Sequence, residues 1–168
     1  MRWPEDAAGW PFAEASRFVG SRPHRWHVQE VGAGPLLLLI HGAGGATQSW
    51  RALIPLLARD HRVVAMDLPG QGFTRRGTGG RCGLDPMAED LLRLIQQEGW
   101  EPEAVIGHSA GVPIALRMAE LGLRPPKGLI GLNAALARFE GVAGWLFPMM
   151  AKLLALNPLT AVLFTATV

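Results

Sequence analysis

The sequence is poor in cysteine and in net charge, and both shortages narrow the range of functions. Cys82 is the single cysteine among 168 residues, so a disulfide within this sequence and a cysteine-type metal site are excluded, and a reducing cytoplasm is expected. The formal net charge is only +2 and the basic residues are scattered, which gives little support to nucleic-acid binding. We expect no cofactor and no metal ion.

Two further absences concern targeting and membrane insertion. Residues 1–6 carry charges and proline rather than an apolar run, so no signal peptide is predicted. Residues 136–168 are strongly apolar, but Pro148, Lys152 and the pair Asn157-Pro158 interrupt them before the ~20 unbroken residues that a membrane helix needs. We expect short apolar helices that form a lid over a pocket, and peripheral membrane contact stays open.

The composition is that of a folded domain. Hydrophobic residues make up 49% of the sequence and charged residues 18%, which excludes a disordered chain. A length of 168 residues is sufficient for one hydrophobic core and too short for two ordinary domains. We predict an irregular arm over residues 1–15, the core over residues 16–135, and the apolar lid over residues 136–168.

Strand patterns are distributed along the whole core. Residues 16–19 and 25–31 alternate polar and apolar side chains around a Gly-Ser-Arg-Pro turn, which predicts an antiparallel hairpin with His24 and His27 at the surface. Four apolar segments have the length of strands buried on both faces of a parallel sheet. They are residues 36–40, 62–66, 104–106 and 128–133.

Helical patterns separate the buried strands. Residues 48–59 carry one apolar stripe, and Pro55 is expected to kink or shorten that helix. A second helix starts with Asp85 as the capping residue before Pro86, and it ends at Gly99. The alternation of strands and helices predicts an α/β fold, a mainly parallel doubly wound sheet with helices on both faces and an N-terminal antiparallel hairpin.

The motif G-x-S-x-G, from Gly107 to Gly111, lies between an apolar strand and an apolar helical segment. This context predicts a sharp strand-to-helix turn that presents Ser109 to a substrate as a nucleophile, with His108 and Ala110 beside it. Only small residues fit two positions to either side of the serine, which explains the two glycines. The Ala110 amide at the helix N-terminus favours a developing negative charge. The alternative is a tight turn with a surface serine.

A glycine-rich loop, His41-Gly42-Ala43-Gly44-Gly45, directly follows the first buried strand. It lacks the G-K-[ST] and G-x-G-x-x-G patterns of phosphate-binding loops. We expect the amides of Ala43 and Ala110 to form a two-donor oxyanion hole facing Ser109. His41 is expected to hold this loop by hydrogen bonds rather than to act as a base.

Two other reactive side chains receive structural interpretations. Asp67 ends the second buried strand before Leu-Pro-Gly, and its carboxylate is expected to bond the backbone of that turn rather than to act in catalysis. Cys82 lies in a polar, glycine-rich loop over residues 75–83 and is interpreted as an incidental thiol.

Three motifs occur in order along the chain: H-G-x-G before a Ser-Trp pair, then D-L-P-G-x-G, then G-H-S-A-G. They begin at His41, Asp67 and Gly107. In this order and spacing they resemble the α/β-hydrolase superfamily over residues 16–133. The resemblance implies an α/β-hydrolase fold and serine-hydrolase chemistry on an ester-type or acyl-type bond.

A narrower resemblance extends toward both ends of the sequence. The magnesium-chelatase accessory proteins of the BchO type, α/β-hydrolase-fold proteins of bacteriochlorophyll synthesis, are similar at residues 15–19, 26–29, 72–74, 114–119 and 157–159. This resemblance implies a role near magnesium insertion into protoporphyrin. It implies a small apolar substrate or a porphyrin in the pocket, magnesium-chelatase subunits as partners, and a place in the cytoplasm or at the periphery of the photosynthetic membrane.

The sequence departs from the superfamily pattern after Ser109. The triad of this fold runs Ser, then Asp or Glu, then His, but no histidine and no aspartate follow Ser109. The remaining acids are Glu120, expected in the helix after the turn, and Glu140, expected at the start of the lid, and neither suits the triad. We expect the front part of a longer protein, nearly inert by itself. The alternative is a natural short form without hydrolase chemistry. A second hypothesis for the function is a non-catalytic accessory protein that binds a porphyrin or a chelatase subunit.

Overall fold

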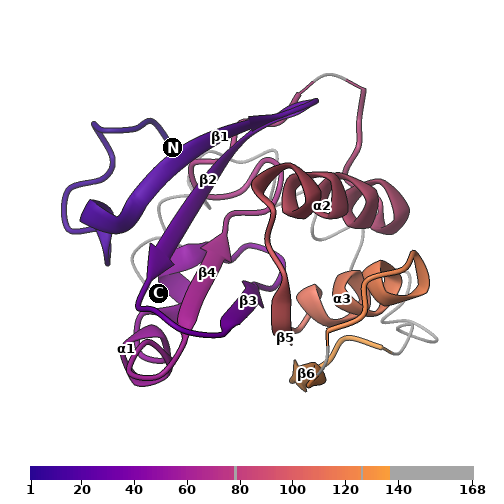
Figure 1. Cartoon of the computed structure of the whole chain (residues 1–168). Helices are drawn as coiled ribbons and strands as arrows, with labels where there is room; N and C mark the ends of the chain where they lie inside the picture. The colour runs from indigo at the N-terminus through magenta and orange to yellow at the C-terminus, as the bar shows by residue number, and fades with distance from the viewer. Residues whose placement is uncertain (78, 126, 137–168) are drawn as a thin grey trace, which may run out of the picture. The chain divides into compact units, whose positions relative to one another are not determined.

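Six strands form one mixed sheet, in the order β1-β2-β4-β3-β5-β6, within the residues that the computed structural model describes (1–77, 79–125 and 127–136; Figure 1). The central pairs β4–β3, β3–β5 and β5–β6 are parallel, whereas β1–β2 and β2–β4 are antiparallel. The predicted parallel sheet with an N-terminal hairpin is confirmed. The strand bounds are β1 (Ser16–Ser21), β2 (His24–Val31), β3 (Leu36–Ile40), β4 (Arg62–Met66), β5 (Pro102–His108) and β6 (Gly128–Leu132).

The helices between the strands differ from the sequence prediction in two places. The continuous helix predicted over residues 48–59 is wrong, whereas the interruption expected from Pro55 is confirmed, because proline cannot donate a backbone hydrogen bond and its ring excludes a preceding helical turn. The structure has a short 3-10 helix and then a helix that starts beside the proline. The helical bounds are η1 (Ala13–Ala15), η2 (Thr47–Trp50), α1 (Ile54–Leu57), α2 (Leu84–Glu98) and α3 (Gly111–Glu120).

The start of α2 also differs from its prediction, whereas its end agrees. Gly83, not Asp85, is the N-terminal capping residue. Asp85 lies in the first turn, exposed, and accepts a hydrogen bond from the Arg117 side chain at 2.7 Å. The helix ends at Gly99 with a φ of 63°, a left-handed conformation that glycine adopts without strain.

The central strands are buried because helices cover both faces of the sheet. Side chains alternate between the faces along a strand, so Leu38 and Val64 pack in one cluster with residues of α2 and α3. Leu39 and Ala65 pack in a second cluster with residues of η2 and α1. Figure 1 shows α2 and α3 together on one side of the sheet and α1 on the other.

The predicted surface position of His27 is wrong, because the ring is fully buried. The rings of Trp3 and Phe73 lie 5.5 and 5.3 Å from the imidazole, centroid to centroid. The Nδ1 atom bonds the Asp67 carboxylate at 2.7 Å and Nε2 bonds the Ser16 hydroxyl at 2.9 Å. Because both ring nitrogens have partners, burial leaves no polar group unsatisfied.

His24 is buried as well, so its predicted place at the surface is also wrong. Its Nδ1 accepts a hydrogen bond from the Gly77 amide at 3.1 Å, and its Nε2 donates to Asp90 at 3.1 Å. Burial favours the neutral form of Asp90, but hydrogen bonds from Arg81, Arg93 and His24 outweigh it. The pKa of Asp90 therefore lies below its ordinary value of 3.8.

The strand β6 is not the buried strand that its apolar sequence predicts. Within the described residues it pairs with β5 alone and forms an edge of the sheet. Ile130 is 49% exposed and Leu132 is 37% exposed. An apolar run by itself does not distinguish a central strand from an edge strand, because burial depends on neighbours.

The first 15 residues pack onto the sheet. Ala7 and Trp10 are buried in a third cluster with Ala46 and Phe73. The Trp10 indole donates a hydrogen bond to the Thr47 hydroxyl at 3.1 Å. This segment therefore helps to bury the His27 ring, against which Trp3 and Trp10 both pack. The predicted lid over residues 136–168 lies outside the described residues, apart from Leu136.

Candidate active site

Ser109 occupies the sharp turn between β5 and α3. Its φ of 49° lies in the left-handed region, which few residues other than glycine adopt. Its amide donates to the Leu132 carbonyl at 2.9 Å, and its carbonyl accepts from the Val112 amide at 3.1 Å. These bonds hold the backbone in its strained conformation at the carboxyl end of the strand, where such turns present a nucleophile.

Gly107 and Gly111 allow this turn to close. A methyl group on Gly107 would lie 2.8 Å from the Gly111 carbonyl oxygen, nearer than carbon and oxygen approach without strain. A methyl group on Gly111 would collide with the Ile40 carbonyl oxygen and lie 2.8 Å from that of His41. The two glycines therefore bring β5, α3 and the end of β3 together.

Residues 41–47, here called the His41 loop, lie directly against the turn. A methyl group on Gly42 would lie 3.0 Å from Cβ of Ser109, so the absence of a side chain lets the two segments meet. Ala43 and Ala110 directly follow these two residues. Within the described residues neither of their amides donates a hydrogen bond to a protein group. Two unpaired amides on adjacent loops suit the stabilisation of an oxyanion.

His41 holds this loop from inside the protein. Its Nδ1 donates to the Gly42 carbonyl at 2.7 Å, and its Nε2 accepts a hydrogen bond from the Leu68 amide at 2.9 Å. The ring is fully buried, and burial lowers the pKa of His41, so the neutral form is favoured. Both nitrogens are occupied by backbone groups, so no nitrogen is free for proton transfer.

Two further hydrogen bonds tie the His41 loop to the turn that begins at Asp67. The Thr47 amide donates to Oδ1 of Asp67 at 2.6 Å, and the Gly44 amide donates to Oε1 of Gln71 at 2.6 Å. Oδ2 of Asp67 also accepts from the Phe73 amide at 2.7 Å, which confirms the predicted role of Asp67 in its turn. The loop that carries Ala43 is thus fixed along its length.

A pocket of about 320 Å³ opens beside the two unpaired amides. Ala43 and Ala110 line it together with Gln71, Cys82 and a set of apolar side chains. These apolar residues are Leu68, Leu84, Met87, Pro113 and Ile114. The pocket therefore suits a mainly apolar group next to Ser109.

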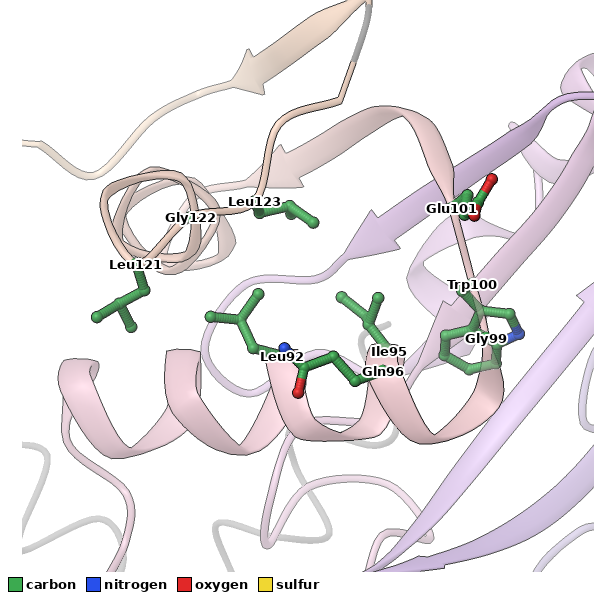
Figure 2. A pocket seen from close by; sticks show the side chains of 9 residues that line it. All are labelled: Leu92, Ile95, Gln96, Gly99, Trp100, Glu101, Leu121, Gly122 and Leu123. Carbon is green, nitrogen blue, oxygen red and sulfur yellow. The ribbon is translucent and has the colours of Figure 1, made fainter.

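A second pocket, of about 350 Å³, lies between the C-terminal parts of α2 and α3 (Figure 2). Leu92 of α2, Trp100 before β5 and Leu123 after α3 line it. Trp100 precedes β5 and Ser109 follows it, so the length of this strand, about 20 Å, separates the two. A molecule in this second pocket is therefore out of reach of Ser109.

The described residues supply no acid or base to Ser109. None of them forms a hydrogen bond with its hydroxyl, and the His108 ring packs against Trp50 with a centroid distance of 6.4 Å. Glu120 ends α3, where it is exposed and accepts a hydrogen bond from Arg117 at 2.8 Å. Glu140 lies outside the described residues.

The strand order, the serine turn and the neighbouring glycine loop point together to one family. Residues 35–164 match the family model described as the alpha/beta hydrolase fold. This chain belongs to the α/β-hydrolase fold family. The superfamily resemblance deduced from the three motifs is confirmed.

A relative of high sequence identity is a magnesium-chelatase subunit. This chain is 51% identical over 162 residues to the magnesium-chelatase 30 kDa subunit of Rhodobacter capsulatus, covering 94% of this chain and 56% of the relative. It is 33% identical over 131 residues to the 2-hydroxy-6-oxo-2,4-heptadienoate hydrolase of Pseudomonas putida, covering 76% of this chain and 48% of the relative. The chain thus spans about half the length of these relatives.

One solved structure is similar to this chain over most of its length. The α/β-hydrolase chain superimposes on Cfl2 of Burkholderia cenocepacia with a TM-score of 0.68 at 27% sequence identity. The superposition covers 90% of this chain and 54% of the solved chain. The similarity therefore includes most of this chain and again about half of the neighbour.

Within the described residues, no helix is long and apolar enough to cross a bilayer. The same residues include no group of three histidine, cysteine or acidic side chains close enough to hold a metal ion. Residues 137–168, for which peripheral membrane contact stays open, lie outside this part of the chain.

Sequence reasoning did not single out Gln71. It occupies the variable position of D-L-P-G-x-G, and nothing in one sequence distinguishes a glutamine that bonds a distant loop from one in solvent. The sequence around His27 gave no signal of its burial, because Trp26 and Val28 alternate with polar residues, and alternation is typical of a strand with one face in solvent.

Proposed function

We propose that this chain is part of a cytoplasmic α/β-hydrolase-fold accessory protein of magnesium chelatase in bacteriochlorophyll biosynthesis, with a serine-hydrolase site at Ser109. The relative that is 51% identical over 94% of this chain, named as a magnesium-chelatase 30 kDa subunit, supports the accessory role. The partners would be the other magnesium-chelatase subunits.

The proposed chemistry is acyl transfer to Ser109. Its oxygen attacks the carbonyl carbon of an ester-type or acyl-type bond while a base takes the hydroxyl proton. The amides of Ala43 and Ala110 stabilise the negative charge on the former carbonyl oxygen. The leaving group departs with a proton, and water then releases the acyl group. The triad acid and base belong to the remainder of the protein in this proposal.

One observation carries the enzymatic proposal: Ala43 of the His41 loop and Ala110 of the serine turn line one mainly apolar pocket, and their amides have no hydrogen-bond partner among the described residues. The test is covalent labelling of the full-length protein by a fluorophosphonate, with the label located by peptide mass spectrometry. We expect labelling at Ser109, lost in Ser109→Ala and in heat-denatured wild type. A folded full-length protein that takes no label would contradict the proposal.

The alternative function is non-catalytic binding of a porphyrin or a chelatase subunit. It is favoured by the absence of an acid or base partner for Ser109 among the described residues. It predicts that protoporphyrin shifts its visible absorption bands when the full-length protein is added, equally in wild type and in Ser109→Ala. An unchanged spectrum would exclude porphyrin binding.

A further inference from the structure

The loop between β4 and α2 carries Arg76 near the pocket that Ala43 and Ala110 line, here called the Ser109 pocket because Ser109 directly precedes Ala110. The Arg76 guanidinium donates a hydrogen bond to the Cys82 sulfur at 3.5 Å, and Cys82 lines the pocket next to Leu84 and Met87. The aliphatic part of Arg76 lies over the Pro-Gly turn, because a methyl group on Gly70 would be 3.9 Å from its Cδ. The side chain is thus held between this turn and the pocket wall.

The backbone around Arg76 is fixed at both ends. Arg75 pairs with Arg25 of β2 through two backbone hydrogen bonds of 3.0 and 3.1 Å. The Gly77 amide donates to His24, and any side chain at Gly77 would collide with the Pro23 carbonyl. Arg76 lies between these two anchored residues, so its place beside the pocket is set by the fold.

The guanidinium of Arg76 has no carboxylate partner among the described residues. Two acids of α2 bond other arginines, since Arg81 bonds Glu89 at 2.7 Å and Asp90 at 2.8 Å. Arg93 bonds Asp90 at 2.6 Å as well. The thiol of Cys82 is a weak acceptor, so the guanidinium retains most of its capacity to bind an anion.

We propose that Arg76 recognises an anionic end group of the substrate, so that the site takes molecules with an apolar body and a carboxylate. This inference rests on the proposed function in so far as it takes the Ser109 pocket as the substrate site. The apolar walls accommodate the body, the unpaired amides of Ala43 and Ala110 receive the reacting carbonyl, and Arg76 binds the carboxylate at the rim. A guanidinium suits a carboxylate because its planar N–H groups match the two oxygens.

Cys82 provides a readout that does not depend on catalysis. In the full-length protein, N-ethylmaleimide alkylates the exposed thiol, and mass spectrometry of the Cys82 peptide gives the rate. Decanoate and decanol, both below their aggregation limits, are compared by the concentration that halves this rate. We expect decanoate to protect at a concentration about fivefold lower than decanol, the scale of one exposed ion pair.

Variants at Arg76 and at the neighbouring Arg75 distinguish recognition of the carboxylate by the Arg76 guanidinium from a general effect of positive charge. In Arg76→Gln the preference for decanoate should disappear, and in Arg76→Lys part of it should remain. Arg75→Gln, with the same change of charge one residue away, should keep the preference. Equal protection by the two ligands in wild type, no protection by either, or a preference that survives in Arg76→Gln would each overturn the proposal.

Fluorophosphonate labelling of Ser109 distinguishes a failure of the Arg76 proposal from a failure of the proposed hydrolase function. A protein that shows the Arg76-dependent preference for decanoate but takes no fluorophosphonate has an anion-recognising pocket without hydrolase chemistry. A protein that is labelled at Ser109 but protects Cys82 equally with both ligands is a hydrolase that does not use Arg76 for recognition.

Discussion

The side-chain oxygen of Gln71 accepts a hydrogen bond of 2.6 Å from the backbone amide of Gly44, a residue 27 positions away in the sequence. Gly44 follows Ala43 directly in the His41 loop. The bond therefore restricts the orientation of the Ala43 amide, one of the two proposed oxyanion donors. Gln71 also lines the pocket beside Ser109, so it positions the loop from within the site.

Replacing Gln71 by methionine should lower the rate of Ser109 labelling in the full-length protein by about tenfold, since a misplaced donor stabilises the reacting oxygen less well. Gln71→Glu retains the acceptor and should recover part of the rate. The control is Gln97→Met, because Gln97 bonds the Gly20 carbonyl on the hairpin, outside the pocket. Equal labelling rates for Gln71→Met and wild type would refute the positioning role.

Alanine at Gly111 should destabilise the folded protein by about 3 kcal/mol, because its methyl group has no space beside the Ile40 and His41 carbonyls. Alanine at Gly20 should change the free energy of unfolding by no more than about 0.5 kcal/mol, since no atom lies within 4 Å of its methyl position. Urea unfolding monitored by tryptophan fluorescence measures both. Similar unfolding free energies for the two variants would contradict the described packing of the turn.

The His41 imidazole should remain neutral below the ordinary histidine pKa of 6.5, because burial lowers its pKa. The folded state then binds fewer protons than the unfolded state, so the contribution of His41 to stability is complete above pH 6.5 and declines as the pH falls below it. Nitrogen NMR of the ring should show the Nδ1–H tautomer at pH 6.5. A ring already half protonated at pH 6.5 would contradict this assignment.

Asp90→Asn should destabilise the protein at pH 7 by about 2 kcal/mol, because the buried carboxylate accepts hydrogen bonds from Arg81, Arg93 and His24 that a neutral amide cannot fully replace. The pKa of Asp90 is lowered in the folded state, so its contribution is complete above the ordinary value of 3.8 and is lost as the pH falls below that value. The difference in unfolding free energy between wild type and Asp90→Asn should therefore shrink from pH 5 to pH 2. A constant difference across that range would show that the Asp90 charge is not involved.

Much of the fold can be predicted from the sequence, because the conformation of its strands and turns depends on residues that are close together in the chain. The apolar run of β3 has the length of a strand buried on both faces, and every residue of this strand is buried. The spacing of Gly107, Ser109 and Gly111 indicates a turn that larger residues cannot form, and the strained φ of Ser109 agrees with it. Even the break at Pro55 follows from a chemical property of the residue itself.

The tertiary structure alone decided which polar residues have distant partners. His24 and His27 are buried because Asp90 and Asp67 lie within hydrogen-bond distance, 66 and 40 positions away in the sequence. Gln71 and Arg76 lie beside the Ser109 pocket because the fold brings together the loops that follow the parallel strands β3, β4 and β5. Periodicity and turn chemistry determine local conformation, but these contacts depend on the register in which separate segments meet.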